Sequence, residues 1–329
     1  MDGVVGLDIG GANTKAAVVG EDGVPRVASA PYEIWRNPES LGPAIAGVVD
    51  RLDVPGAPVA LTTTAELSDV FASKREGVAR VLDAAQTALP GRELRVFTTA
   101  GALVPVGAAR ERPLEVAAAN WLASALLVAR TVNDAILVDC GGTTTDLIPI
   151  AGGEVVARGR TDLERLRHGE LVYTGALRTN VAAIVQRVPI GGEACPVAAE
   201  LFAISADAYL LLGRLTPEQC TCSFPDGRGT SREDVRARLA RVVCADPEQL
   251  TDGDLEAIAA AVETAQVDAI AGALERHAPR PVVAVGVGAF LVRAAAERCG
   301  LSVRDDAGPL SGPGGDVAAA VALSVLGRG

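Results

Sequence analysis

The chain is poor in aromatic residues, histidine and lysine, and each shortage limits the cores or the kinds of functional site that the chain can form. Only 3% of its 329 residues are aromatic, so the core must be built from Ala, Val, Leu and Ile. Two histidines, His168 and His277, exclude a multi-histidine metal site and disfavour a Ser-His-Asp triad. The net charge of −11 disfavours a nucleic-acid partner, because binding to a phosphate backbone relies on clustered Lys and Arg.

Long apolar runs are also missing. No stretch of eighteen apolar residues occurs, and the N-terminus enters a strand pattern without a basic region or cleavage site. We therefore expect a cytoplasmic protein that does not contact a membrane. The cysteines are scattered and fit reduced thiols: Cys140, Cys195, Cys220, Cys222, Cys244 and Cys299. Cys220 and Cys222 lack the spacing of a zinc knuckle, so thiols are preferred to a metal site.

What the sequence does contain is one motif in two copies. VVGLDIGGANTKAAVV, residues 4–19, and AILVDCGGTTTDLIPI, residues 135–150, each have a strand ending in an aspartate, a Gly-Gly turn and a second apolar strand. Gly10 and Gly11, like Gly141 and Gly142, leave no Cβ in the turn, so backbone N–H groups can approach anionic oxygens. Each copy predicts a phosphate-binding hairpin, and a plain turn is the alternative for either copy alone.

The residues around the glycines extend this prediction. Asp8 and Asp139 suit a hydrated Mg²⁺, which takes one or two carboxylates plus phosphate oxygens. Lys15 of the first copy stands where the second has Asp146, so we expect a cation and an acid facing a phosphate chain. Lys15 is one of two lysines, and its compact ammonium suits a tight phosphate site, although a surface lysine is the plain alternative. The small polar residues of the two turns complete the predicted contacts: Asn13, Thr14, Thr143 and Thr144.

A chain of this length predicts two domains. We expect a first lobe over residues 1–131 and a second over 132–329, with an irregular substrate-recognition insertion at about 155–245. A C-terminal helix, capped by Asp316, is expected to return to the first lobe. The other patterns predict strands near 27–32, 59–71 and 94–98, and helices at 41–52, 74–89, 113–130, 231–243 and 252–277.

The paired hairpins resemble the superfamily of actin, sugar kinases and Hsp70. That resemblance implies an α/β fold with duplicated actin-like ATPase (ribonuclease H-like) lobes around a central cleft. In its ATP-binding members a turn such as the one holding Gly286 and Gly288 lies against the nucleotide; a strand-to-helix turn without a ligand is the alternative.

Finer motifs narrow the resemblance. DIGGANTKAA, TTTAELSDVF, FTTAGAL, AAANWLASA, DCGGTTTDLIPI, YTGALRT, AAELFAISADAYLLLG and DGRGTSRED, which span nearly the whole chain, are together similar to the hydantoinase/oxoprolinase family in its branch linked to tetrahydromethanopterin-dependent one-carbon metabolism. This branch implies a transferase of methanofuran or methylofuran biosynthesis. Its substrates would be (5-aminomethylfuran-3-yl)methyl diphosphate and the phenol of γ-glutamyltyramine, and its products an aryl ether and diphosphate.

The predicted site residues are of the types that this reaction requires. A phenol, with a pKa of about 10, is a poor nucleophile at neutral pH, whereas diphosphate leaves readily once its charge is neutralised. Glycine amides, Lys15 and a Mg²⁺ on Asp8 and Asp139 would neutralise it. Asp146 and Asp207 are the candidate bases for the phenol. An exposed position on a helix is the alternative for Asp207.

Four further residues are predicted to bind substrate. Arg178 is suited to the glutamyl carboxylate, because a guanidinium forks onto carboxylates, and Tyr173 lies in the same turn. Glu66 either faces the cleft or caps the next helix. Asn120, inside an apolar helical pattern, needs a partner if it is buried.

Two rival functions stay open. One is an ATP-dependent small-molecule kinase or an amide hydrolase of the hydantoinase/oxoprolinase type, which the turn at Gly286 favours. The other is a nucleotide-binding sensor without turnover. ATP or ADP would be a cofactor of these rivals and is not expected for the favoured reaction, and the sequence does not predict an oligomeric state.

Overall fold

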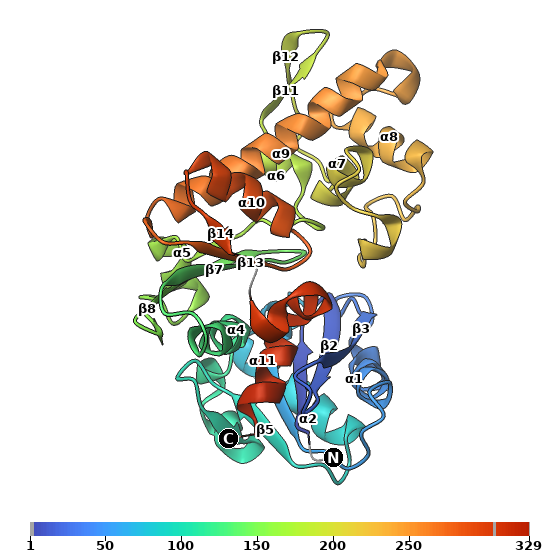
Figure 1. Ribbon diagram of the computed structural model, residues 1–329. Coiled ribbons are helices and arrows are strands. Elements are labelled where there is room, and N and C mark those ends of the chain that lie inside the picture. Colours follow the sequence, from blue (N-terminus) through green and yellow to red (C-terminus); the bar gives the residue numbers. More distant parts are fainter. Residues whose placement is uncertain (1–2, 305–306, 329) are drawn as a thin grey trace. The chain divides into compact units, whose positions relative to one another are not determined.

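The computed structural model describes residues 3–304 and 307–328 (Figure 1). Contacts between Cα atoms divide the chain into two compact units. Unit 1 comprises Met1–Leu137, Ile148–His168 and Asp305–Gly329, and unit 2 comprises Val138–Leu147 and Gly169–Arg304. The first division falls after Leu137, whereas the sequence predicts a boundary between residues 131 and 132. The segment Ile148–His168, predicted in the second lobe, belongs to unit 1.

Unit 1 is built on a six-stranded mixed sheet of order β3-β2-β1-β4-β5-β6. The strands are β1 (Val5–Ile9), β2 (Asn13–Val19), β3 (Pro25–Pro31), β4 (Val59–Thr63), β5 (Leu94–Phe97) and β6 (Leu103–Pro105). β4 runs parallel to β1, whereas β2 runs antiparallel to it. Strand β4 stops at Thr63, short of the predicted residue 71, because a 3-10 turn, η2 (Ala65–Leu67), follows it.

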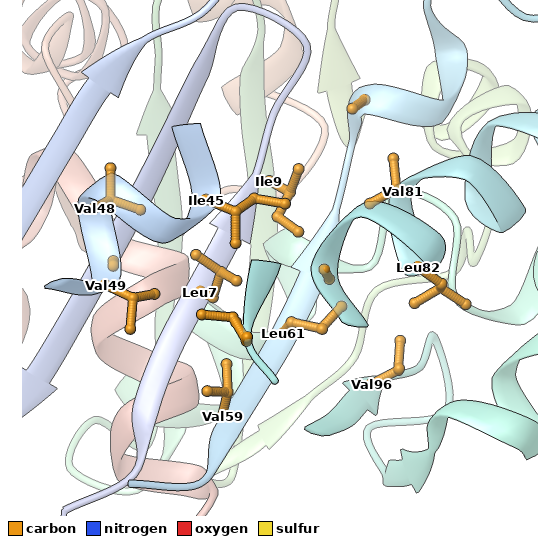
Figure 2. Packing of buried hydrophobic residues seen from close by; sticks show 14 of the residues in the cluster. Leu7, Ile9, Ile45, Val48, Val49, Val59, Leu61, Val81, Leu82 and Val96 are labelled. Atoms are coloured by element: carbon orange, nitrogen blue, oxygen red, sulfur yellow. The ribbon is translucent and has the colours of Figure 1, made fainter. Parts of the chain in front are cut away.

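The two faces of this sheet carry different helices. Leu7 and Ile9 point toward α1 (Leu41–Asp50) and α2 (Lys74–Ala88), and Figure 2 shows them packed against Ile45 and Leu61. Gly6 faces the other way, since side chains alternate along a strand, and a Cβ there would overlap the backbone of Ala320 in α11 (Ala318–Leu326). Helix α11 therefore packs directly on β1 (Figure 1). Asp8, two residues on, shares the α11 face.

Two predictions about unit 1 helices are wrong. The helix expected at 113–130 is a 3-10 turn, η3 (Pro113–Glu115), followed by α4 (Asn120–Ala129), because Ala118 between them has a φ of 49°, outside the helical region. Asp316 does not cap α11; the residue preceding that helix is Val317, at the end of the 3-10 segment η7 (Gly312–Val317). The remaining helical elements of this unit are α3 (Val106–Glu111), α5 (Asp162–His168), η1 (Pro38–Ser40) and η6 (Gly308–Leu310).

A second sheet has the order β10-β8-β7-β13-β14, with β9 paired to β8. Its strands are β7 (Ala135–Cys140), β8 (Thr145–Ala151), β9 (Glu154–Val155), β10 (Leu171–Val172), β13 (Val282–Val285) and β14 (Val303–Arg304). Helix α10 (Ala289–Arg298) follows β13 and packs against α9 (Asp252–Leu274). By length and composition alone α9 is apolar enough to cross a membrane, but half of its most apolar window is buried and Leu255, Ile258 and Val262 belong to a hydrophobic core.

The segment 155–245 is more regular than predicted. It contains the hairpin of β11 (Arg187–Ile190) and β12 (Glu193–Pro196), and the helical elements α6 (Val181–Ile184), α7 (Ser205–Leu211), η4 (Pro217–Gln219) and α8 (Arg232–Arg241), with η5 (Pro247–Gln249) just beyond it. Ser231 caps α8 by accepting a hydrogen bond from the backbone N–H of Asp234. Helices α7, α8 and α9 share a second hydrophobic core, so much of this segment is folded on α9.

Candidate active site

The first hairpin has the predicted geometry. The backbone N–H of Gly10 donates to the carbonyl of Asn13 across 3.0 Å and closes the turn between β1 and β2. Asp8 and Lys15 stand directly opposite each other in the antiparallel register, which brings their Cβ atoms within about 5.5 Å on one face of the sheet. Lys15 is half-buried, whereas Thr14, on the opposite face, is fully buried and belongs to the packing of unit 1.

A third charged residue of unit 1 lies near this pair. Asp316, at the end of the segment that leads into α11, has an exposed side chain close to Lys15. The surrounding protein raises the pKa of Asp316 and the Lys15 ammonium opposes the rise. The sequence pattern predicts a helix cap at Asp316, and no local signal connects this residue with a lysine 301 positions earlier in the chain.

The second hairpin repeats the closing bond of the first. The N–H of Gly141 donates to the carbonyl of Thr144 across 2.9 Å, the same two positions of the motif as in the first copy. Asp146 lies on β8 opposite Leu171 of β10 and is 9% exposed. Thr143 and Thr144 are half-buried at the turn. The duplicated sequence is thus a duplicated structure.

The glycine-rich turn after β13 packs on this second hairpin. Gly286 has a φ of +88°, and a Cβ there would lie 2.6 Å from the Oδ1 of Asp139. The N–H of Gly288 donates to the carbonyl of Cys140 across 2.8 Å. The Cys140 side chain is buried, as strand alternation predicts, and burial raises its thiol pKa to about 12. Close backbone packing therefore requires glycine at residue 286 whether or not a ligand binds there.

Arg178 lies against the same hairpin. Its N–H donates to the carbonyl of Gly142 across 2.8 Å, and its Nη1 donates to the Oγ1 of Thr143 across 3.3 Å. Tyr173, at the start of this turn, is 54% exposed. The structure places Arg178 at the Gly-Gly turn of the second hairpin, a position that its sequence context did not indicate.

Asp207 is fully buried, so its predicted alternative position on an exposed helical face is wrong. Its Oδ1 accepts a hydrogen bond from the Nε of Arg238 at 2.8 Å, and its Oδ2 accepts one from the N–H of Ile204 at 3.0 Å. Burial raises the carboxyl pKa to about 6 although Arg238 opposes the rise. Because Oδ1 pairs with Arg238 of α8 and Oδ2 caps the N-terminus of α7, this geometry gives no support to Asp207 as a base.

Glu66 does not cap α2, since Ser73 does so by accepting from the N–H of Glu76. Its side chain is 1% exposed, in the turn that follows β4 and alongside the first hairpin, where the N–H of Thr64 donates to the carbonyl of Ile9. Burial raises the Glu66 pKa to about 7; hydrogen bonds from its own backbone and from Ala118 lower it, as does Lys74, and Asp162 raises it. Asn120 is the half-buried first residue of α4, not a mid-helix residue.

The buried Glu66 carboxyl makes stability depend on pH. Its folded pKa of about 7 exceeds the unfolded value of 4.5, so the folded state holds the proton more tightly and loses this stabilisation as pH rises between the two values. Relative to Glu66→Gln, we expect the wild-type free energy of unfolding to fall by about 2 to 3 kcal/mol from pH 5 to pH 8. Urea unfolding at both pH values measures this.

Glu256→Gln, the same substitution at an exposed position of α9, controls for the loss of one negative charge. A wild-type protein and a Glu66→Gln variant with parallel pH dependences would contradict the expected proton uptake at Glu66.

Comparison with solved structures defines the fold class. The chain is similar to acetone carboxylase in its nucleotide-free structure, with 12% identity, 97% of this chain and 70% of that chain covered, and a TM-score of 0.57. It is also similar to the PilM-PilN type IV pilus biogenesis complex, with 14% identity, 99% and 98% coverage, and a TM-score of 0.51. With the two hairpins, these likenesses confirm the predicted actin-like ATPase fold.

The family follows from the sequence itself. The model of the hydantoinase/oxoprolinase family matches residues 58–324, and the chain belongs to that family. A relative from Methanocaldococcus jannaschii is 39% identical over 253 residues, which cover 77% of this chain and 74% of the relative; it is named (4-{4-[2-(gamma-L-glutamylamino)ethyl]phenoxymethyl}furan-2-yl)methanamine synthase. A relative of the same name from Methanococcus vannielii is 39% identical over 116 residues, covering 35% of this chain and 52% of the relative.

Proposed function

We propose that this enzyme joins (5-aminomethylfuran-3-yl)methyl diphosphate to the phenol of γ-glutamyltyramine, with release of diphosphate, in methanofuran or methylofuran biosynthesis. The observation that carries the proposal is the 39% identity to a synthase whose name describes this phenoxymethyl-furan product, across 77% of this chain and 74% of that synthase. The substrates are accordingly small molecules, and the two hairpins supply the phosphate-binding chemistry that a diphosphate substrate requires.

The bonds change as follows. The phenol oxygen forms a bond to the furan CH₂ carbon, the bond from that carbon to the diphosphate oxygen breaks with its electron pair on the leaving group, and the phenol proton passes to a base. In unit 1, Lys15 neutralises charge that develops on the leaving oxygens, and Gly10 and Gly11 leave the turn's backbone open to them. In unit 2, the turn of Gly141 and Gly142 offers the same backbone.

Magnesium remains the cofactor that suits these residues. No group of three or more His, Cys, Asp or Glu gathers anywhere in residues 3–304 and 307–328, and a hydrated Mg²⁺ needs only one or two protein carboxylates. Each unit offers one carboxylate that would hold such an ion: Asp8, opposite Lys15 in unit 1, and Asp139, against the turn of Gly286 in unit 2. Bound there, the ion would neutralise diphosphate charge.

Asp146 is the better of the two candidate bases. It lies on β8, within the second hairpin, whereas Asp207 lies outside both hairpins, in α7, where it pairs with Arg238. The tight packing of Gly286 and Gly288 on Asp139 and Cys140 gives their turn a structural reason that involves no nucleotide, which weakens the main argument for an ATP-dependent kinase or hydrolase.

We expect one diphosphate released for each aryl ether formed when the enzyme receives both substrates and Mg²⁺ without ATP. A pyrophosphatase-coupled phosphate assay measures the diphosphate, and mass spectrometry measures the ether. Omission of γ-glutamyltyramine is the matched control, because release should then stop. Product formation that requires ATP and yields ADP in proportion would overturn the proposal in favour of a kinase or hydrolase.

A further inference from the structure

The turn that carries Arg178 is held by buried polar side chains that are distant from it in sequence. We call residues 174–179 the Arg178 turn. Gln266 of α9 is 1% exposed, and its Nε2 donates both to the Oγ1 of Thr174, at 2.5 Å, and to the carbonyl of Gly175, at 3.0 Å. The hydroxyl of Tyr209, a fully buried residue of α7, donates to the Oε1 of Gln266.

Gln266 lies on the buried stripe of α9, four residues from Val262 and four from Ile270. Both N–H bonds of its amide are used on the Arg178 turn, and its oxygen is used by Tyr209. An apolar side chain of similar length would fill the volume but leave these partners without a hydrogen bond. Buried polar groups without a partner destabilise the folded state and are rare in proteins. The amide therefore has a directional role at this position.

The other side of the Arg178 turn rests on the second hairpin. The Oγ1 of Thr145 donates to the carbonyl of Thr174 across 2.8 Å, and a Cβ on Gly175 would lie 2.5 Å from the backbone nitrogen of Thr143. The N–H groups of Leu177 and Arg178 both donate to the carbonyl of Gly142. The turn is thus clamped between α9 and the phosphate hairpin, all within unit 2.

We propose that Arg178 binds the diphosphate of the substrate, not the glutamyl carboxylate, and that Gln266 positions Arg178 for it. The half-buried guanidinium lies beside Thr143, at the turn of the second hairpin, where Gly141 has only the carbonyl of Thr144 near the place of a Cβ. A guanidinium forks onto two phosphate oxygens, which a lone Lys15 in the other copy does not do. The inference rests on the proposed function, because it assigns a cation of unit 2 to the diphosphate of that reaction.

The test measures the dissociation constant of inorganic diphosphate with Mg²⁺ by isothermal titration calorimetry, and the KM of γ-glutamyltyramine by the coupled assay. Arg178→Ala should weaken diphosphate binding about tenfold or more, as expected for loss of a charge-assisted hydrogen bond, and leave the phenol KM within about twofold. Arg187→Ala, which removes an exposed arginine from β11 of the same unit, should change neither.

Gln266→Met should weaken diphosphate binding several-fold, and Tyr209→Phe should do so less. Gln186→Met, the same substitution at an exposed site, is the control. In the double variant Arg178→Ala/Gln266→Met the loss should equal that of Arg178→Ala alone, because a positioning residue has no effect once the residue it positions is gone. If Gln266→Met instead disturbs the structure in general, its loss of diphosphate affinity should add to that of Arg178→Ala. Should Gln266→Met fold poorly, Tyr209→Phe, which deletes one hydroxyl, serves as the test variant.

Each other outcome decides against the inference. A raised phenol KM with unchanged diphosphate binding in Arg178→Ala would assign Arg178 to the glutamyl carboxylate. Additive losses in the double variant would leave Gln266 without a positioning role. A wild-type protein that binds no diphosphate would overturn the proposed function together with the inference, whereas tight wild-type binding that survives Arg178→Ala overturns the inference alone.

Discussion

Lys15→Ala is expected to lower turnover about a hundredfold while the KM of the phenol substrate stays nearly unchanged. Charge on the departing diphosphate oxygen is largest in the transition state, and removal of one preorganised partner commonly costs about 3 kcal/mol there. Lys15 stands opposite Asp8 in the register of β1 and β2, on the face that α11 covers. Asp8→Asn should have an effect of the same order. Steady-state kinetics at saturating phenol substrate measure both.

Arg95→Ala is the matched control. It removes a cation from β5 of the same unit, where the 55% exposed side chain pairs with Glu93, and it should leave turnover unchanged. If Lys15→Ala and Asp8→Asn keep near wild-type turnover with normal folding, the first hairpin is only a structural turn, and its part in the proposed mechanism falls.

Arg238→Met is expected to lower the free energy of unfolding by about 3 to 5 kcal/mol, the usual cost of leaving a buried charge without its partner. Arg238 and Asp207 are both 0% exposed, and the arginine also donates to Asp226 and to the carbonyl of Gly229. Its guanidinium stacks 4.1 Å from the centre of the Phe224 ring. Loss of Arg238 therefore affects α7, α8 and the 224–229 loop together. Guanidinium chloride unfolding measures the change.

Two variants control this prediction. Arg214→Met breaks an ion pair with Glu263 in which the arginine is 51% exposed, and such pairs contribute less than about 1 kcal/mol. The double variant Asp207→Asn/Arg238→Met should regain part of the loss, because it removes the unpaired charge. If Arg238→Met lowers the free energy of unfolding no more than Arg214→Met does, then water or neighbouring residues fully compensate the charge of Asp207, and the prediction is wrong.

Features that depend on neighbouring residues were predictable. The two Gly-Gly turns close with equivalent bonds, from Gly10 to Asn13 and from Gly141 to Thr144, because strand alternation and glycine geometry act over a few residues. The cap of α8 at Ser231 is similarly local. The helix expected at 113–130 is interrupted because contacts distant in sequence override helix propensity. Ala117 forms a β-bridge with Thr63, and the N–H of Ala118 donates to the carbonyl of Thr63.

The amino-acid sequence by itself determined the duplicated hairpins, the actin-like fold class and the family, since repeated motifs carry that information at fixed spacings. Only the tertiary structure decided which side chains surround them. Glu66 becomes a carboxyl with a pKa of about 7 because the folded chain buries it. Arg178 joins the second hairpin because Gln266, 92 residues from Thr174, holds its turn there. Such partners are distant in sequence, and no local pattern specifies desolvation or a hydrogen bond between residues that meet only on folding.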